Sequence, residues 1–538
     1  MAVVNDQCVV EEALIGIHPD TYRSPLGPPP LPLVPTQPSR SVRNLVSWAF
    51  SGTYDENKPT LTDAEQPSRY LTKFKAIDLM AGLAGSFEPR RTVCVHSPND
   101  VLYPVLVLAI LAPACTWTGT NAASTSVELQ HHFTSSKATC VITHLEHLQT
   151  VQTAIDACVG NIEIVIWTDI LSEDTSGTKL ASGHRTLHDL LQRPRTRTLE
   201  SRLEGIPNNF PATIFSTSGT TGLPKMIQRT HRELILESKA TEDVPKPYPV
   251  RRLYCTPMFH AYSFIDMTIN SFRLGLPSFY MRRYDESFAQ KVHQFSATET
   301  LVAPPVLMRL SNQAKEDPEA RQNIQSLQTV ICAGAPLSAP LRLTFVQLFE
   351  PPVRLIQGWS MSEGGWFTTF PYPESASILS LLVDGRQLAS ELLVRAPQMP
   401  RSYLDNPSAT AEAFTVDGWL RTGDIGYSSD GKIYLVDRVK DMIKVNGWSV
   451  APAELEAALY KNPRVLDADV VGHGSGVGEH PVIFVVAKGG EVSCADITDN
   501  LLLFVARFKV AKCEVRFVNS IPRNPSGKIL RKGLRELL

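Results

Sequence analysis

Residues 215–225 read Phe-Ser-Thr-Ser-Gly-Thr-Thr-Gly-Leu-Pro-Lys, and this stretch is the strongest structural signal in the chain. Two glycines, five hydroxyl side chains and Lys225 occupy eleven positions directly after an apolar run. Glycine permits turns that a Cβ forbids, so successive N–H groups can point at one anion, and the lysine adds a positive charge. The stretch predicts a polyphosphate-binding loop. It is not a Walker A loop, because Lys225 follows Leu-Pro and precedes Met226. A Ser/Thr/Gly linker is the alternative.

The overall composition is that of an ordinary globular protein. The chain has 538 residues, of which 43% are hydrophobic and 20% charged, and its length suggests about two to four domains. With a net charge of −2, the chain has no excess of positive charge that would favour binding to nucleic acid or to an anionic membrane. Nine isolated cysteines without a C-x-x-C pair indicate reduced thiols and argue against a structural zinc site.

No targeting or membrane-spanning segment stands out in the sequence. The N-terminus lacks a basic region followed by a long apolar run, and the C-terminal Arg-Glu-Leu-Leu is not a peroxisomal tripeptide, so we expect a cytoplasmic protein. Residues 101–117 carry no charge, but they fall short of the ~20 residues of a span and include Pro104 and Pro113. A buried helix leading into a buried strand explains them better.

Changes of pattern divide the chain into three parts. Residues 1–40 contain a proline-rich arm at 24–37, predicted to lie on the protein as an extended strut. From residue 41 to about 350, helical periodicity alternates with short apolar runs, which predicts α/β layers with a largely parallel sheet. The expected strands are 91–96, 139–143, 162–167, 213–216, 252–256, 300–303 and 329–333.

The sequence pattern changes again near residue 390. Closely spaced strands and the turns Asp417-Gly418 and Asp430-Gly431 predict a small barrel or antiparallel sheet at about 385–437. After Asp437 the pattern is α+β, with a helix expected over 452–460. We therefore assign 41–437 to one large domain and 438–538 to a C-terminal domain.

Three further motifs carry chemistry. Residues 357–363 read Gln-Gly-Trp-Ser-Met-Ser-Glu, in which an aromatic among small residues suits a nucleotide base and Glu363 suits hydrated Mg²⁺ beside phosphates. Residues 418–424 end in Asp424, and an acidic side chain at a strand end can bind ribose hydroxyls. Residues 521–531 form a polar loop that presents Lys528. Each motif alone is more often a structural turn.

Together and in this order, the motifs resemble the adenylate-forming superfamily of acyl-CoA synthetases, luciferases and peptide-synthetase adenylation domains. The nearest branch is the coumarate–CoA ligase-like acyl and aryl ligases, including those of fungal secondary metabolism. The resemblance runs from about residue 45 to the end and rests on seven blocks: 215–225, 257–260, 333–337, 357–363, 422–424, 437–438 and 525–528. It implies an α/β fold with a large N-terminal domain of two α/β layers plus a small β-barrel, and a mobile α+β C-terminal lid.

The resemblance implies an AMP-forming acid–thiol ligase that converts a carboxylic acid and ATP to acyl-AMP and pyrophosphate, then transfers the acyl group to CoA. Lys528, Ser362 and His260 would be catalytic, with Lys528 bridging the carboxylate and the α-phosphate, which Ser362 would approach. Glu363 would hold Mg²⁺, and Lys440 would be the hinge of the lid. The nucleotide contacts implied are Thr217, Ser218, Gly219, Thr220, Thr221 and Lys225 at the phosphates, Gly334, Gln357, Gly358 and Trp359 at the adenine, and Asp424, Arg438 and Lys444 elsewhere on the nucleotide.

The acid is predicted to lack an ammonium group. Relatives that take α-amino acids have an aspartate where this chain has His260, and the next carboxylate is Asp266. A buried ammonium without a partner would be costly. The implied pocket contains small and aromatic residues, which suit an aryl or medium-chain acid: His260, Tyr262, Ser263, Phe264, Ala303, Pro304, Cys332 and Gly358.

The acceptor and the integrity of the site leave alternatives open. Arg283 matches a basic position that meets CoA phosphates, whereas Asn446-Gly447 stands where CoA ligases usually have Lys-Gly. The alternative acceptor is the phosphopantetheine arm of a carrier protein. Only 27 residues separate Glu363 from Glu391, fewer than in relatives, and this predicts an incomplete barrel strand with an exposed edge. A degenerate homologue that binds nucleotide without turnover is therefore a third possibility.

Overall fold

The fold is taken from a computed structural model of the whole chain. It describes residues 8–9, 44–172, 183–192, 203, 205–217, 224–242, 245–335, 337, 339–368, 372, 390–429, 432–445, 448–474, 479–488, 492–510, 512–523 and 529–538. The proline-rich run at 24–37 lies outside these residues.

The first layer is a seven-stranded sheet in the order β10-β9-β5-β4-β6-β7-β8, parallel except for β10. Its strands are β4 (Thr92–His96), β5 (Thr116–Thr120), β6 (Cys140–Thr143), β7 (Glu163–Ile166), β8 (Arg185–Thr186), β9 (Pro211–Ser216) and β10 (Met226–Thr230). The helices of this part are α2 (Leu45–Ala49), α3 (Lys73–Ala84), α4 (Tyr103–Leu111), α5 (Ser126–Ser136), α6 (Leu148–Asp156), α7 (Leu187–Leu191) and α9 (His231–Ala240).

The second layer is another seven-stranded sheet, in the order β15-β14-β13-β11-β12-β2-β3, with only β3 antiparallel. Its strands are β2 (Pro59–Asp63), β3 (Tyr70–Thr72), β11 (Arg252–Tyr254), β12 (Ser278–Tyr280), β13 (Glu299–Val302), β14 (Thr329–Cys332) and β15 (Arg354–Gln357). Its helical segments are α10 (Ala261–Phe264), a π-helix (Ile265–Asn270), α11 (Ser271–Leu274), α12 (Phe288–Gln294), α13 (Pro304–Glu316), α14 (Pro318–Asn323) and α15 (Ala339–Val346).

These two sheets confirm the predicted α/β layers. Each of the seven expected strands overlaps a strand of the sheets, because buried parallel strands read as short apolar runs bounded by turn residues. The uncharged run at 101–117 folds into α4, whose residues are all buried, and the start of β5. Among the described residues, no helix is both long and apolar enough to cross a membrane.

The third unit is a four-stranded sheet in the order β1-β18-β19-β20, where the sequence predicted a small barrel or antiparallel sheet. Its elements are β1 (Cys8–Val9), β18 (Ser390–Val394), β19 (Leu420–Ser429) and β20 (Lys432–Arg438), with α16 (Pro407–Ala413) beside it and the hairpin β16 (Ser360–Met361) and β17 (Gly365–Trp366) before it. The edge expected to be exposed is partly covered, since Cys8 and Val9 pair in parallel with Leu392 and Leu393. The sequence did not predict β1.

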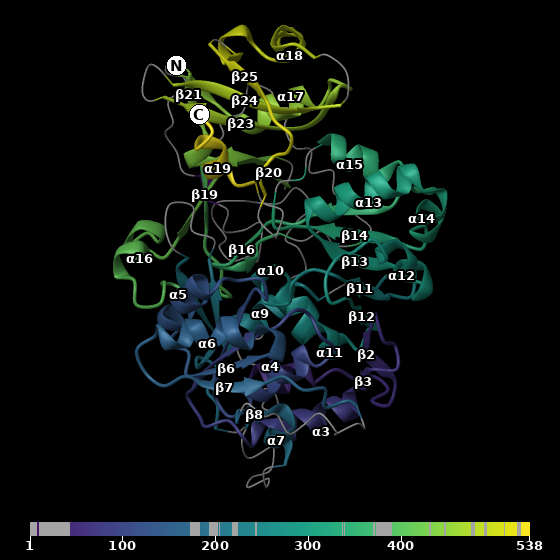
Figure 1. Cartoon of the computed structure of the whole chain (residues 1–538), viewed down its shortest axis with the longest axis vertical. Coiled ribbons are helices and arrows are strands. Elements are labelled where there is room, and N and C mark those ends of the chain that lie inside the picture. Colours follow the sequence, from purple (N-terminus) through teal and green to yellow (C-terminus); the bar gives the residue numbers. More distant parts are fainter. Residues whose placement is uncertain are drawn as a thin grey trace.

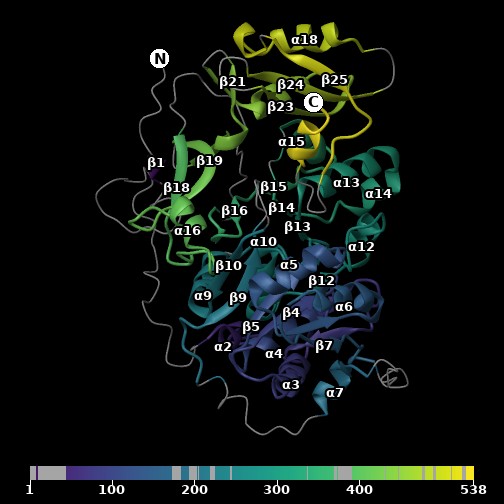
Figure 2. The same ribbon diagram turned by 60° about the vertical axis from the view of Figure 1, so that its left-hand side comes forward.

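The C-terminal domain has its own sheet, β23-β24-β25, and its own hydrophobic core. Figures 1 and 2 show it at one end of the elongated molecule, beyond β19 and β20. Its elements are a 3₁₀ turn (Val439–Asp441), β21 (Ile443–Val445), β22 (Trp448–Val450), α17 (Pro452–Leu459), β23 (Val465–His473), β24 (His480–Ala487), α18 (Cys494–Leu502), a 3₁₀ turn (Arg507–Val510), β25 (Glu514–Phe517) and α19 (Arg531–Arg535).

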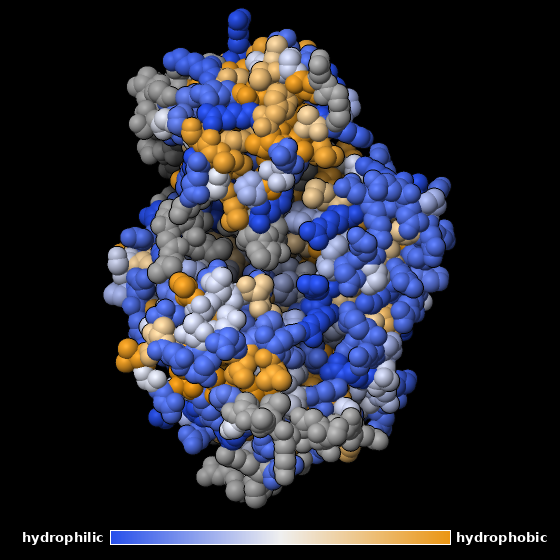
Figure 3. Space-filling view, in the orientation of Figure 1, coloured by the Kyte–Doolittle hydropathy of each residue, from blue (hydrophilic) through white to orange (hydrophobic). Residues whose placement is uncertain are grey.

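Core packing ties the later motifs to the first sheet. Trp359, Trp366 and Tyr403 belong to the same buried cluster as α4 and β5, although they lie more than two hundred residues further along the chain. The second sheet has a separate core. Figure 3 shows a mainly hydrophilic surface over α12 to α14, with hydrophobic residues gathered on the C-terminal domain.

Candidate active site

The ends of the predicted phosphate loop are held together by β9 and β10. Ser216 pairs with Met226, the Thr217 N–H donates to the Lys225 carbonyl over 2.8 Å, and the Lys225 N–H donates to Thr217 Oγ1 over 3.3 Å. Residues 218–223, which include the predicted Ser218, Gly219, Thr220 and Thr221, lie outside the described residues. The paired strands place Thr217 and Lys225 at the neck of this loop.

The predicted adenine residues follow the carboxyl ends of β14 and β15, which is where open α/β sheets bind ligands. Gly334 has a φ of +87°, a conformation that favours glycine, and the ring of Tyr262 lies across it. A Cβ on Gly358 would come 2.0 Å from the indole of Trp366. Glycine at 358 therefore allows the Trp366 ring to lie directly against the backbone, whereas glycine at 334 is favoured by its backbone conformation.

Asp424 connects Trp359, in the segment predicted to bind adenine, with Arg438 at the domain boundary. Its two carboxylate oxygens accept from the Trp359 indole N–H over 2.9 Å and from Arg438 Nε over 2.8 Å. Burial by itself would lower the pKa of Arg438, but attraction to Asp424, then to Asp441 and Glu363, raises that pKa overall. Trp359, Asp424, Arg438 and Glu363 thus form one site, although they come from three separate segments.

Glu363 and Lys225 meet through a residue that the sequence reasoning did not single out. The Tyr403 hydroxyl donates to Glu363 Oε1 over 2.7 Å, and the Lys225 ammonium lies 5.1 Å from the centre of the Tyr403 ring. Tyr403 and Glu363 are both buried. Tyr403 follows Glu363 by 40 residues and was not among the predicted site residues, because sequence spacing gives no sign of this contact.

The segment that carries the predicted acid pocket runs through α10 and the π-helix. Burial lowers the pKa of His260 to about 4, so its imidazole is neutral near pH 7. Tyr262 is buried, and its carbonyl accepts from the Trp366 indole over 2.8 Å. The Ser263 hydroxyl donates to the Pro257 carbonyl, and Phe264 packs on Trp117 and Phe215 in the first layer. The Ser263 hydroxyl is therefore bonded to nearby backbone, and the Phe264 ring lies in the core.

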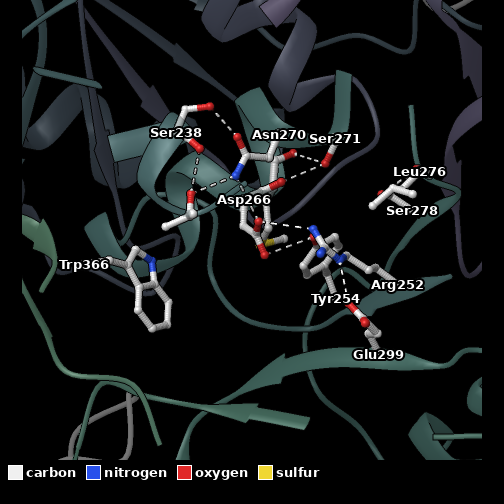
Figure 4. A network of polar contacts seen from close by, with 12 residues as sticks. Ser238, Arg252, Tyr254, Asp266, Asn270, Ser271, Leu276, Ser278, Glu299 and Trp366 are labelled. Atoms are coloured by element: carbon white, nitrogen blue, oxygen red, sulfur yellow. Dashed lines mark hydrogen bonds and ion pairs between the residues drawn. The ribbon is translucent and has the colours of Figure 1, made fainter. Parts of the chain in front are cut away.

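A buried polar network fixes this helical segment from behind (Figure 4). Arg252 donates to Asp266 over 3.3 Å and to Glu299 over 3.1 Å, while Asn270 links Asp266 to Ser238. The Asp266 carboxylate is therefore neutralised by Arg252. Asp266, the first carboxylate after His260 in the sequence, is thus already paired with Arg252.

The remaining predicted residues are scattered or lie outside the description. Arg283 is exposed just after β12, Lys440 lies in the turn between the domains, and Lys444 lies in β21. Ala303 and Pro304 start α13, Cys332 ends β14, and Ser362 lies between β16 and β17. Lys528, Asn446 and Gly447 are outside the described residues. The roles of all these residues remain predictions.

Comparison with known proteins assigns the family. The AMP-binding enzyme family matches residues 78–384, and its C-terminal domain family matches residues 454–528. An acyl-CoA ligase of a Phoma species is 53% identical over 521 residues, covering 92% of this chain and 96% of that protein. A phenylacetyl-CoA ligase of Aspergillus niger is 34% identical and covers 92% and 97% of the two chains.

Solved structures agree on the fold. An anthranilate CoA ligase in complex with anthranoyl-AMP superposes with a TM-score of 0.78 at 20% identity, covering 92% of this chain and 97% of that one. ATP-bound MatB from Rhodopseudomonas palustris gives a TM-score of 0.75 at 20% identity, covering 92% and 99%. With the motifs in order and relatives matched over nearly their full length, the chain belongs to the AMP-binding enzyme family and, within it, to the acyl-CoA ligases.

Proposed function

We propose that this ligase uses ATP to activate an aryl or medium-chain acyl carboxylic acid without an ammonium group and transfers the acyl group to the thiol of CoA. The observation that carries the proposal is the convergence of Lys225, Glu363, Asp424 and Arg438 at one site. Such a combination of cations and carboxylates fits a nucleotide polyphosphate with its counter-ion.

The pocket residues support an acid without an ammonium group. His260 is neutral near pH 7, and Asp266 is already paired with Arg252. A substrate ammonium would enter this pocket without a partner, at a cost of several kcal/mol, roughly as for other unpaired buried charges. The ring of Tyr262, which lies beside Gly334, offers a flat surface instead.

The proposed reaction has two steps. The carboxylate oxygen of the acid attacks the α-phosphorus of ATP, the bond to the pyrophosphate oxygen breaks, and pyrophosphate leaves. The CoA thiol then loses its proton to solvent, its sulfur attacks the acyl carbon, the bond from that carbon to the phosphate oxygen breaks, and AMP leaves. Both steps build negative charge on oxygen, so positioning and cations are the main contributions asked of the protein. Lys225 would supply positive charge from the large domain and Arg438 from the domain boundary, and Lys528 would supply it from the lid during adenylation. The lid would then rotate about Lys440 and move Lys528 away before the thiol step.

The donor set fits Mg²⁺, which usually binds through one or two carboxylates together with substrate phosphates. Glu363 would hold the ion beside the phosphates that Lys225 is predicted to bind. When bound, Mg²⁺ would neutralise charge on the phosphate oxygens.

A matched pair of acids tests the proposal. We expect 3-phenylpropanoate to support pyrophosphate release and phenylalanine to give no release above background, since the two differ by the ammonium group. Mass spectrometry with CoA present should then detect the acyl-CoA. Acid-dependent release without a thioester would point to a carrier-protein acceptor. ATP binding with no release for any aryl or medium-chain acid would favour a degenerate homologue.

Replacing Asp424 with asparagine is expected to raise the KM for ATP about tenfold or more. The change removes the charge that Arg438 and the Trp359 indole both contact, and hydrogen bonds to a charged group are worth about 1.5–3 kcal/mol. Initial rates of pyrophosphate release against ATP concentration measure the effect. The KM for the acid should stay within about twofold, and a variant with an unchanged KM for ATP would exclude the ribose role.

A further inference from the structure

We infer that Tyr403 is a positioning residue that holds Glu363 in place for the metal ion and keeps Lys225 apart from that carboxylate. The inference rests on the proposed function, because it assigns a task to a residue beside the proposed metal ligand. It adds a residue that no motif of the sequence identified.

The backbone of Tyr403 is fixed to the strand that follows the phosphate loop. Tyr403 forms an antiparallel bridge with Ile227, and the Leu404 N–H donates to the Met226 carbonyl over 2.8 Å. The Tyr403 N–H donates to Thr410 Oγ1 over 3.0 Å. The backbone at residue 403 is therefore joined both to β10 and to the middle of α16, and the side chain is buried.

The side chain of Tyr403 contacts both charged groups of the site. The hydroxyl donates to Oε1 of Glu363 over 2.7 Å, which fixes the orientation of the carboxylate that would hold the metal ion. A carboxylate ligand held in this way presents a fixed oxygen to a metal.

The ring performs a second task toward Lys225. The ammonium lies 5.1 Å from the ring centre, within the range of a cation–π contact. The ring thus gives the lysine an alternative to pairing with Glu363. A direct ion pair between the two would use the charges that the phosphates and the metal ion require.

Three variants separate these tasks. Tyr403→Phe removes the hydroxyl and keeps the ring, and Tyr403→Leu removes both while leaving an apolar side chain. Tyr434→Phe is the matched control, because Tyr434 lies in β20 and stacks on Tyr427. Circular dichroism and the thermal midpoint should show that Tyr403→Phe is folded like the parent.

Direct binding of Mn²⁺ in the presence of α,β-methylene-ATP, followed by electron paramagnetic resonance, provides a readout independent of turnover. Tyr403→Phe should raise the Kd for Mn²⁺ about 10-fold to 100-fold, as for other groups that orient a metal ligand, and should raise the Mg²⁺ concentration for half-maximal rate in parallel. Tyr403→Leu should also raise the KM for ATP about threefold or more. Tyr434→Phe should change none of these, and the KM for the acid should be constant throughout.

Unchanged Mn²⁺ affinity in a folded Tyr403→Phe protein would overturn the inference. Absence of Mn²⁺ binding by the parent would overturn it too, since Glu363 would then hold no metal. The outcome stands apart from the proposed reaction: a parent that binds Mn²⁺ with the analogue but activates no acid would refute the reaction, while loss of that binding in Tyr403→Phe would still support the role of Tyr403.

Discussion

Replacing Lys528 with alanine is expected to slow acyl-adenylate formation by about 100-fold to 1,000-fold, the loss typical of one electrostatic group that acts on the transition state. The attacking carboxylate and the α-phosphate are both anions, and Lys528 is the cation predicted to lie between them. The described residues on either side of its segment meet, since Arg523 pairs with Ile529 and the Leu530 N–H donates to the Pro522 carbonyl over 2.8 Å. ATP–pyrophosphate exchange measures this step.

The control for Lys528 separates its role from a general effect of charge on the lid. Lys488→Ala removes an exposed lysine just after β24 and should leave the exchange rate within about twofold. Lys528→Ala should still convert synthetic acyl-AMP and CoA to the thioester at near the parent rate, because that step follows adenylation. Exchange by Lys528→Ala near the parent rate would exclude the predicted role.

The two α/β layers could be predicted because their signals are local. Buried parallel strands such as β6 and β14 are short apolar runs bounded by polar residues. The antiparallel pair β19 and β20 flanks residues 430–431, where an Asp-Gly turn was predicted. The order of the motifs was equally informative about the site. Asp424 and Arg438 belong to neighbouring strands, and their pairing across β19 and β20 brings them together.

The contacts that complete the site could not be predicted, because each depends on tertiary pairing. Tyr403 bridges to Ile227 across more than 170 residues, and nothing beside it in the sequence indicates a partner. The same is true of β1, whose two residues pair with β18. An ion pair between Arg229 and Glu237 is a third case, since the spacing alone is that of two ordinary surface residues near the start of a helix.

That ion pair connects the phosphate-loop strand to the acid pocket. Both side chains are fully buried, and Arg229 also donates to the Gln398 carbonyl over 2.8 Å. The Glu237 carboxylate accepts from the Trp366 N–H over 3.1 Å and occupies the space where Gly365 has no Cβ. Trp366 in turn lies on Gly358 and donates to the carbonyl of Tyr262. Glu237 thereby supports the segment after Glu363.

Replacing Glu237 with alanine is expected to destabilise the large domain by about 3–5 kcal/mol, because it leaves the Arg229 guanidinium buried without its partner. Burial raises the pKa of Glu237 although Arg229 lies beside it, so desolvation offsets much of the attraction within the pair. The pair itself then adds little stability, and most of the loss comes from breaking it. Urea denaturation followed by tryptophan fluorescence measures the change.

The double variant Arg229→Met, Glu237→Gln separates the stability that the ion pair itself adds from the cost of leaving Arg229 without its partner. It removes both charges, while the glutamine oxygen can still accept from the Trp366 N–H. We expect it to recover most of the stability lost by Glu237→Ala, because neither position then leaves a buried charge without its partner. A double variant as unstable as Glu237→Ala would mean that the charges themselves hold the domain together. Because Glu237 supports Trp366 and Trp366 contacts Tyr262, Glu237→Ala should also raise the KM for the acid, and the double variant should restore it.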